Sequence, residues 1–423
     1  MNLDYDIAIV GAGAAGLAAA IFAAQECGDA RVVLLDGAKK IGAKILVSGG
    51  GRCNVTNERV TANDFHGQKS VVRHVLGSFN HRRAIEWFES LGINLKLENT
   101  GKLFPVSDKA STVLNALIQR CHALWVDIRP QHRVTSIHQN SDIPDRPHFT
   151  IEHSQGTTTA PCLIMATGGR SLPRTGSDGG GWGIVRALGH TVTATFPALA
   201  PLVLDSSMFH QSLAGLAMNV GLSTSVDGKL IDRRTGSLLW THFGVSGPVV
   251  MDASRFWLIA QADSYSSPRL ACSFLPDGDF AKVEQWLVDR SGASPKRSIV
   301  NVLAERFTKR FAEAILKHDR VPLDSVMAHL SRDHRRTIVH SLIDLELPVQ
   351  RDRGWNYAEV TAGGVPLDEI DRRTMESKRV SGLFLTGEML DCDGRIGGFN
   401  FQWAWATGHM AGRAAAQHIR NKT

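Results

Sequence analysis

The chain has little of several features that define specialised classes of protein. Its six cysteines are spread over 423 residues without a C-x-x-C pair, which argues against a structural zinc, a redox dithiol and a disulfide framework. None of its 17 histidines falls in H-E-x-x-H or another metal-ligand spacing, so we expect no metal site. Cysteines without a disulfide framework are typical of the reducing cytoplasm, which is where we expect the protein.

Long runs of one charge are also absent. Lys and Arg exceed Asp and Glu by six, and the excess is scattered along the chain, so it predicts neither a nucleic-acid partner nor a membrane partner. The uncharged residues 7–25 approach the roughly 20 residues of a membrane span. However, Asp4 and Asp6 precede this run where a signal peptide would be basic, and the run contains a glycine pattern with a better explanation.

Glycine is the residue present in excess, at 40 of 423 positions. The most informative glycines are Gly11-Ala-Gly13-Ala-Ala-Gly16, which follow a short apolar run at residues 5–10 and open a small-residue helix. A second apolar strand ends at Asp36, about 20 residues further on, as in dinucleotide-binding βαβ units. The pattern predicts a pyrophosphate at the start of the helix and a ribose hydroxyl on Asp36, which disfavours a 2′-phosphate.

Further glycine clusters favour FAD over NAD as the resident dinucleotide. Each alone is typical of a turn, but several widely spaced clusters suit a long cofactor that needs close backbone approach at many places. They lie at residues 48–54, 166–169, 179–181, 361–365 and 397–398.

At these motifs the chain resembles the bacterial flavoproteins known as aminoacetone-oxidase-like or bile-acid dienone-reductase-like NAD(P)/FAD-dependent oxidoreductases. The resemblance covers nearly the whole chain and rests on the first glycine motif together with four others. These are Ser48-Gly-Gly-Gly-Arg-Cys-Asn54, Thr241-His-Phe-Gly-Val-Ser-Gly-Pro248, Ala358-Glu-Val-Thr-Ala-Gly-Gly-Val365 and Gly387-Glu-Met-Leu-Asp-Cys-Asp-Gly394 with the following Gly397 to Trp405.

The resemblance implies an α/β fold in which a glutathione-reductase-like, FAD-binding Rossmann domain is interrupted by an insert domain. We place the two parts of the Rossmann domain at residues 1–191 and 351–423. The insert at 192–350 reads as a β-rich barrel or sandwich over 192–275, followed by a helical part over 276–340. Within that part, Ser294-Pro295 reads as a helix start, and a single helical face is expected through Ile299, Leu303, Phe307, Phe311 and Ile315.

The cofactor-binding residues are carried over from the family motifs. The resemblance places the amino end of the last helix at the flavin N1–C2=O edge, Glu388 and Asp393 near the ribityl and pyrophosphate groups, and the backbone of Val134 at the adenine. The full expected set is Gly11, Gly13, Ala15, Gly16, Asp36, Lys44, Gly51, Arg52, Cys53, Asn54, Val134, Thr167, Gly168, Gly169, Gly387, Glu388, Asp393, Gly398, Asn400 and Phe401.

Catalytic residues are harder to assign. His242 is the best candidate for an acid or base because histidine titrates near neutral pH, although a histidine satisfied by hydrogen bonds at a domain boundary fits it at least as well. Cys53 lacks a neighbouring cysteine and reads as a packing residue rather than a redox thiol.

These observations predict an FAD-dependent oxidoreductase that transfers hydride to or from a small organic substrate. The reductant is open: NAD(P)H could serve as a transient co-substrate, or an amine could reduce the flavin with dioxygen as acceptor. There is no second strand–G-x-G-x-x-G–helix unit for a separate NAD(P)H domain. A flavin-containing RNA-binding or tRNA-modifying protein, and a flavin-binding protein without turnover, remain as alternatives.

Overall fold

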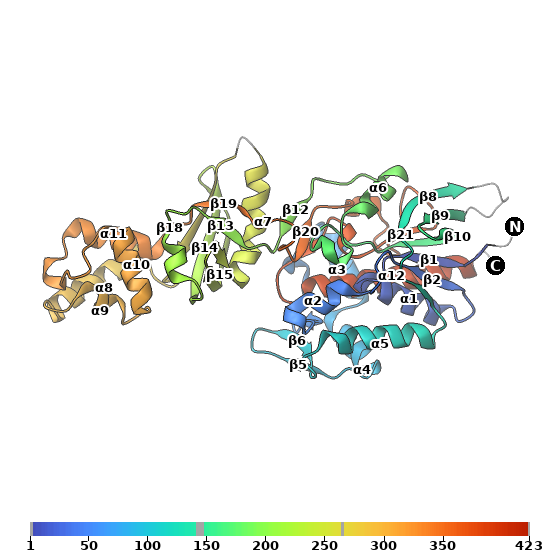
Figure 1. The fold of residues 1–423 in the computed structure, drawn as a ribbon, viewed down its shortest axis with the longest axis horizontal. Helices are drawn as coiled ribbons and strands as arrows, with labels where there is room; N and C mark the ends of the chain where they lie inside the picture. The colour runs from blue at the N-terminus through green and yellow to red at the C-terminus, as the bar shows by residue number, and fades with distance from the viewer. Residues whose placement is uncertain (1–2, 141–147, 264–265, 422–423) are drawn as a thin grey trace. The chain divides into compact units, whose positions relative to one another are not determined.

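The computed structural model describes residues 3–140, 148–263 and 266–421. Its contacts divide the chain into two compact units (Figure 1). The first unit comprises Met1–Pro197 and Glu359–Thr423, and the second comprises Ala198–Ala358. The second unit therefore interrupts the first in sequence, as the fold class requires. Within the described residues, no helix combines the length and the apolar character needed to cross a bilayer.

The first unit is built on a five-stranded, wholly parallel sheet in the order β21-β11-β1-β2-β7. Four of these strands are buried along their full length, which is why they read as short continuous apolar runs. Because the strands are parallel, their carboxyl ends share one edge of the sheet. The strands are β1 (Ile7–Val10), β2 (Val32–Leu35), β7 (Asp127–Arg129), β11 (Cys162–Met165) and β21 (Leu383–Leu385).

Helix α1 (Ala14–Glu26) and helix α12 (Phe399–Arg420) lie side by side in this unit (Figure 1). Their backbones approach so closely that a Cβ atom on Gly408 would lie 2.5 Å from the Ala15 carbonyl oxygen, and one on Gly412 would lie 2.3 Å from the Ala19 oxygen. The alanine-rich sequence of α1 is therefore explained by helix packing, because larger side chains would separate the two helices.

Smaller sheets and further helices complete the first unit. The sheets pair β3 (Thr56–Asn57) and β5 (Leu95–Leu97) with β6 (Lys102–Pro105), β8 (Val134–Asn140) and β10 (Gly156–Ala160) with β9 (His148–His153), β4 (Phe65–His66) with β22 (Asp393–Gly394), and β12 (Phe196–Ala198) with β20 (Val360–Ala362). The helices are α2 (Ala43–Gly51), α3 (Lys69–Ser78), α4 (His81–Ser90), α5 (Ala110–Ala123) and α6 (Gly180–Ala187).

The second unit has its own apolar core and contains an antiparallel sheet of seven strands, in the order β18-β17-β14-β15-β16-β13-β19. The strands are β13 (Leu202–Leu204), β14 (Ala217–Val226), β15 (Lys229–Thr241), β16 (Gly244–Ser246), β17 (Pro268–Ser273), β18 (Leu345–Glu346) and β19 (Val349–Asp352). The helices are α7 (Pro248–Ala262), α8 (Phe280–Ala293), α9 (Ile299–Leu303), α10 (Lys309–His318) and α11 (Arg332–Ile343).

Two sequence-based expectations for the second unit are wrong. The β-rich stretch contains the 15-residue helix α7, which begins at Pro248 after Gly247 in a positive-φ conformation (φ 96°). Proline at the first helical position is a helix start signal that the surrounding β-type pattern obscured.

The expected single helix through Ile299 and Ile315 is two helices. Ser298 rather than Ser294 caps α9, and Thr308 starts α10 by accepting the amide N–H of Phe311 at 3.3 Å. The apolar residues keep a spacing of four across the gap between α9 and α10 because both helices pack on the same apolar core.

His409 on α12 sits among aromatic rings: it stacks on Phe79 (centroids 4.8 Å apart) and meets Phe22 edge-on (4.6 Å). Burial, with the added charges of Arg413 and Arg83, lowers the pKa of His409 to about 4. The imidazole is therefore neutral in the folded protein near pH 6, where the unfolded chain has begun to bind a proton.

The contact between α1 and α12 predicts a strong difference between two helix glycines. Gly412→Ala should destabilise the protein by about 1–3 kcal/mol, because the new methyl group meets backbone that cannot move aside. Gly183→Ala in α6 is the matched control, since its Cβ meets nothing within 4 Å and alanine favours helix. Thermal unfolding followed by circular dichroism should place G412A below and G183A at or above the wild type; equal midpoints would contradict the close contact.

His409 should make stability depend on pH. Its folded pKa lies below the unfolded value near 6.5, so stability is lost as pH falls from about 6.5 towards 4, by at most about 1.4 kcal/mol per pH unit. His409→Phe keeps a ring against Phe22 and Phe79 and removes the proton site. Unfolding midpoints at pH 7 and pH 5 should differ less for H409F than for the wild type, and an unchanged difference would show that His409 does not titrate in this range.

Candidate functional site

The glycine turn between β1 and α1 forms the centre of the site. Gly11 has a positive φ of 104°, and a Cβ there would lie 2.4 Å from the Ala166 carbonyl oxygen. A Cβ on Gly16 would lie 1.8 Å from the oxygen of Gly11, so both glycines are required by packing. In contrast, a Cβ on Gly13 would have no other atom within 4 Å, so Gly13 faces open space. The amino end of α1 is thus accessible to a phosphate, as expected for a dinucleotide site.

Asp36 lies directly after β2, beside this turn. Its carboxylate accepts the amide N–H groups of Ala12 and Ala38, each at 2.7 Å and each on a different oxygen. A carboxylate has about four lone-pair sites, so two acceptor positions are left for hydroxyl groups. The geometry suits the ribose role predicted for Asp36.

The predicted residues Thr167, Gly168 and Gly169 follow β11 on the other side of the turn. The hydroxyl of Thr167 is buried and has no hydrogen-bond partner within the described structure. Gly168 has a positive φ of 72°, and a Cβ on Gly169 would lie 2.5 Å from the Thr361 hydroxyl. These residues therefore bring backbone and one unsatisfied hydroxyl to the same edge as Gly13.

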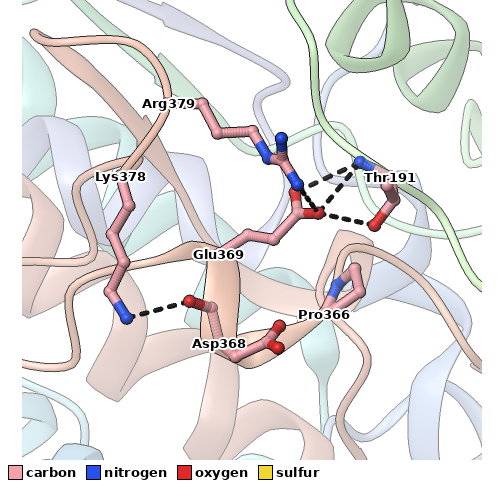
Figure 2. Close-up of a pocket in the computed structure, with 6 residues that line it drawn as sticks. All are labelled: Thr191, Pro366, Asp368, Glu369, Lys378 and Arg379. Atoms are coloured by element: carbon pink, nitrogen blue, oxygen red, sulfur yellow. Dashed lines mark hydrogen bonds and ion pairs between the residues drawn. The ribbon is translucent and has the colours of Figure 1, made fainter.

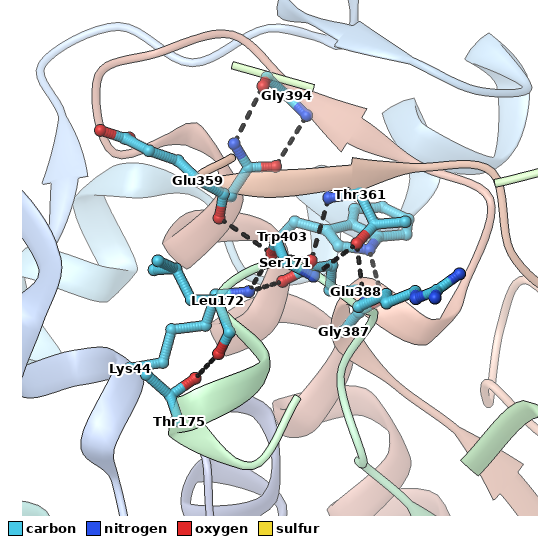
Figure 3. A network of polar contacts seen from close by, with 12 residues as sticks. Lys44, Ser171, Leu172, Thr175, Glu359, Thr361, Gly387, Glu388, Gly394 and Trp403 are labelled. Carbon is cyan, nitrogen blue, oxygen red and sulfur yellow. Dashed lines mark hydrogen bonds and ion pairs between the residues drawn. The ribbon is translucent and has the colours of Figure 1, made fainter. Parts of the chain in front are cut away.

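The carboxyl end of β21 leads into Gly387 and Glu388, and Figure 3 shows the polar network around them. Glu388 accepts Lys44 Nζ at 2.5 Å on one oxygen, and Ser171 Oγ at 2.7 Å and the Thr361 N–H at 3.0 Å on the other. Lys44 Nζ also lies 2.5 Å from Ser171 Oγ. The network joins four segments that are far apart in sequence into one wall of the site.

The amino end of α12 forms a further part of the first unit's site. Gly398 has a positive φ of 94°, and a Cβ there would lie 2.6 Å from the Thr56 carbonyl oxygen and 2.9 Å from Asn54 Oδ1. Asn54 Oδ1 is buried and lacks a hydrogen-bond partner. Asn400 holds the preceding loop by exchanging two hydrogen bonds with the Gly394 backbone, at 2.8 and 2.9 Å.

The remaining predicted cofactor residues are placed as follows. Ala15 is buried in the first turn of α1, and a Cβ on Gly387 would lie 2.9 Å from its methyl group. Asp393 is buried in β22, Val134 is the buried first residue of β8, and the Phe401 ring stacks on Trp405 with centroids 5.5 Å apart.

The segment Gly51 to Cys53 does not present reactive side chains. Gly51 has a positive φ of 84°, where α2 ends in a kink. Arg52 is held by Glu98 at 2.6 Å and lies over the Phe104 ring at 4.0 Å. Cys53 is fully buried, and burial raises the pKa of its thiol to about 12, so it remains protonated and suits packing.

His242 lies in the second unit, exposed between β15 and β16, with its ring 5.1 Å from that of Phe243. It therefore belongs to a different compact unit from the cofactor residues described above. Its catalytic role stays a prediction.

Several residues around the site were not predicted from the sequence. Ser171 and Thr361 hold Glu388, and Thr56 donates its hydroxyl hydrogen to Gln402 Oε1 at 2.7 Å. Thr361 opens a glycine cluster that the sequence did single out, but Ser171 and Gln402 stand in no motif that signals a hydrogen bond over such long sequence separations.

A separate cavity of about 420 Å³ occurs elsewhere in the first unit (Figure 2). Glu369 lines this cavity. Burial alone would raise the pKa of its carboxyl group, but hydrogen bonds from Arg379, Thr191 and His190 lower this pKa to about 2. The Glu369 carboxylate is thus already hydrogen-bonded to protein groups, and we assign no ligand to this cavity. The lining residues are Thr191, Pro366, Asp368, Glu369, Lys378 and Arg379.

The residues described above in the first unit fit a dinucleotide that carries a flavin. They offer open space at Gly13, free acceptor positions on Asp36 and two unsatisfied buried oxygens, on Asn54 and Thr167. Fold and site together define an FAD-dependent oxidoreductase with a Rossmann-type nucleotide-binding unit. The chain belongs to the HI0933-like family, whose Rossmann domain it matches over residues 5–414.

Two relatives match almost end to end. The chain is 32% identical over 412 residues to a 3-dehydro-bile acid delta(4,6)-reductase of Clostridium scindens, covering 97% of this chain and 99% of the relative. It is 34% identical over 406 residues to a ribosomal RNA dihydrouridine synthase of Escherichia coli, covering 95% and 96%. Among solved structures, E. coli quinol fumarate reductase shares the fold with a TM-score of 0.51 at 17% identity, over 99% of this chain and 71% of that one.

Asp36 provides a test of the nucleotide site. Asp36→Asn replaces one acceptor oxygen by a donor, and hydrogen bonds to charged groups contribute about 1.5–3 kcal/mol, so FAD should bind roughly 10- to 100-fold more weakly. Fluorescence titration of the cofactor-free protein with FAD measures this. Asp4→Asn is the control, because Asp4 likewise accepts an amide N–H and a hydroxyl, those of Thr159, at the amino end of β1. Equal FAD affinity in D36N and D4N would contradict the assignment.

Proposed function

We propose that this protein reduces a carbon–carbon double bond conjugated to a carbonyl group in a small organic substrate, with NAD(P)H as transient reductant. When bound, the flavin supplies hydride transfer. The proposal is supported above all by one observation. The first unit brings together glycine turns and unsatisfied polar atoms from five separate segments. These segments lie around residues 13, 36, 54, 167 and 398.

The reactions named for the two relatives support reduction of a conjugated carbon–carbon double bond. One acts on the delta(4,6) system of a 3-dehydro-bile acid, where double bonds are conjugated to an oxo group. The other makes dihydrouridine, which is uridine saturated at the C5–C6 bond next to a carbonyl. Both reactions add hydrogen across an activated double bond, so this reaction is the chemistry that we propose for the present chain.

The residues of this chain would bind the cofactor, orient its ring system and polarise it. The absence of a side chain at Gly398 lets the amino end of α12 pack against the Thr56 backbone. The dipole of α12 would favour negative charge at this end by about 0.3–1 kcal/mol, or up to about 2 when partly buried. Asn54 Oδ1 is an acceptor without a donor, so it would accept an N–H of the bound ring system. His242 remains our candidate for the proton that completes the reduction.

The decisive experiment separates the two half-reactions. Under anaerobic conditions NADH or NADPH should bleach the visible flavin spectrum of the holoprotein, and a conjugated enone should restore it. His242→Gln should slow the second step only. Bleaching by a small amine with release of peroxide would instead indicate an oxidase, and a flavin that no reductant bleaches would indicate a binding protein without turnover.

A second candidate is reduction of uridine in RNA. The E. coli relative above favours it, as does a ribosomal RNA dihydrouridine synthase of Haemophilus influenzae at 31% identity over 403 residues. The helical stretch of the second unit, residues 280–343, carries twelve Lys and Arg against seven Asp and Glu. Incubation of ribosomal RNA with holoprotein and NADPH, with analysis for dihydrouridine, tests this candidate. Binding that weakens steeply with salt would accompany it.

A further inference from the structure

The guanidinium of Arg353, in the second unit, lies over two aromatic rings. Its central carbon is 4.1 Å from the centre of the Phe243 ring and 3.7 Å from the centre of the Tyr357 ring. A turn brings Tyr357 back to Arg353: Gly354 has a positive φ of 78°, and its carbonyl oxygen accepts the N–H of Tyr357 at 3.0 Å. The backbone N–H of Arg353 bonds to the Pro201 carbonyl at 3.2 Å, directly after β19. The position of the guanidinium is therefore set by both rings and by the backbone.

The five N–H donors of this guanidinium have no acceptor in the described part of the chain. No carboxylate of those residues lies within 4 Å of it and no oxygen of theirs accepts its hydrogen bonds, although Asp352 precedes it in sequence. Aromatic faces attract a cation but supply no lone pair for a strong hydrogen bond. Arg234 gives the contrast, because it lies over the Phe256 ring at 5.2 Å and also pairs with Asp232 at 2.7 Å. Arg353 is half-buried, so its free donors indicate an acceptor from outside the chain.

The chemistry of that acceptor follows from the shape and charge of the guanidinium. Its planar fork of donors matches the two oxygens of a carboxylate or a phosphate, and such bidentate pairs are the strong ones. Arg351, two residues earlier, bonds to the Asp352 backbone carbonyl at 3.2 Å and forms no ion pair with a described residue. Two arginines without an acidic partner thus stand close together in sequence, which favours an anion over a neutral carbonyl.

Phe243 connects Arg353 to His242, our candidate proton donor. The rings of Phe243 and His242 are 5.1 Å apart and meet edge to face at 87°. Both residues stand in the loop between β15 and β16, where the Phe243 carbonyl accepts the N–H of Leu204 at 3.1 Å. One substrate would therefore be able to place an anionic group on Arg353 and its reducible bond near His242.

We propose that Arg353 binds an oxyanion of the substrate, a carboxylate or a phosphate, while Phe243 and Tyr357 hold the guanidinium in place. The inference rests on the proposed function, since the same substrate carries the double bond that is reduced, and it defines the substrate class as anionic. Because the two groups present the same fork of acceptor oxygens, the experiment compares them directly.

The test uses the holoprotein and benzylideneacetone that bears, at the para position, a carboxylate, a phosphate or the methyl ester of the carboxylate. Calorimetry without a reductant measures binding of each. The wild type should bind at least one anion about 10- to 100-fold more tightly than the ester, and the tighter anion identifies the group. Arg353→Met should remove this preference without changing the affinity for the ester. Arg353→Lys, which keeps the charge but not the fork, should retain part of it.

Arg306→Met is the matched control. Arg306 also lies over one aromatic ring of the second unit, that of Trp286 at 4.6 Å, but it is exposed. R306M removes an equal charge and should keep the preference of the wild type for the anion. Should R353M fail to bind even the ester, the comparison passes to R353K, which must then bind the anion more weakly than R306K does.

The inference is overturned if the wild type binds the ester as tightly as both anions, or if R353M and R306M lower the affinity for the anion equally. Its failure is distinguishable from failure of the proposed function. An anion whose binding depends on Arg353, but which the holoprotein does not reduce with NADH or NADPH, would overturn the proposed function and leave the oxyanion site standing. Where reduction occurs, R353M should raise KM for the anion about as much as it weakens binding, with kcat little changed.

Discussion

Backbone-to-backbone contact at the amino end of α1 is the constraint on which the first unit depends. Gly11 lies against the residues after β11, Gly16 lies against Gly11, and Gly408 and Gly412 of α12 lie against the carbonyl groups of α1. None of these contacts tolerates a Cβ. Together they hold the first helix at a fixed place on the sheet, which leaves Gly13 open in front of the helix dipole.

Polar groups around this constraint fall into two kinds. Those that hold the wall of the site are fully paired, as Glu388 is with Lys44 and Ser171. Those that face the proposed cofactor, on Asn54 and Thr167, lack partners. Because an unsatisfied buried oxygen is costly, we expect a bound cofactor to supply the missing partners of these two oxygens.

The interrupted Rossmann architecture was predictable because its signals are local. A strand, a glycine turn, a helix and a terminal acid are read within 36 residues, and the structure confirms that fold class. Prediction failed where local signals compete. Helix α7 stands among strands, and the break between α9 and α10 lies inside an unbroken apolar spacing that only the capping side chain of Thr308 reveals.

By itself the sequence determined where glycine must occur and which strand it follows, since positive φ and close packing are properties of a residue and its neighbours. Only the tertiary structure decided which hydroxyls and ions meet. Ser171 reaches Glu388 across 217 residues, and Arg133 reaches Asp178 through strand order rather than through any motif. Such partners arise from the parallel sheet, because it gathers the carboxyl ends of strands distant in sequence at one edge.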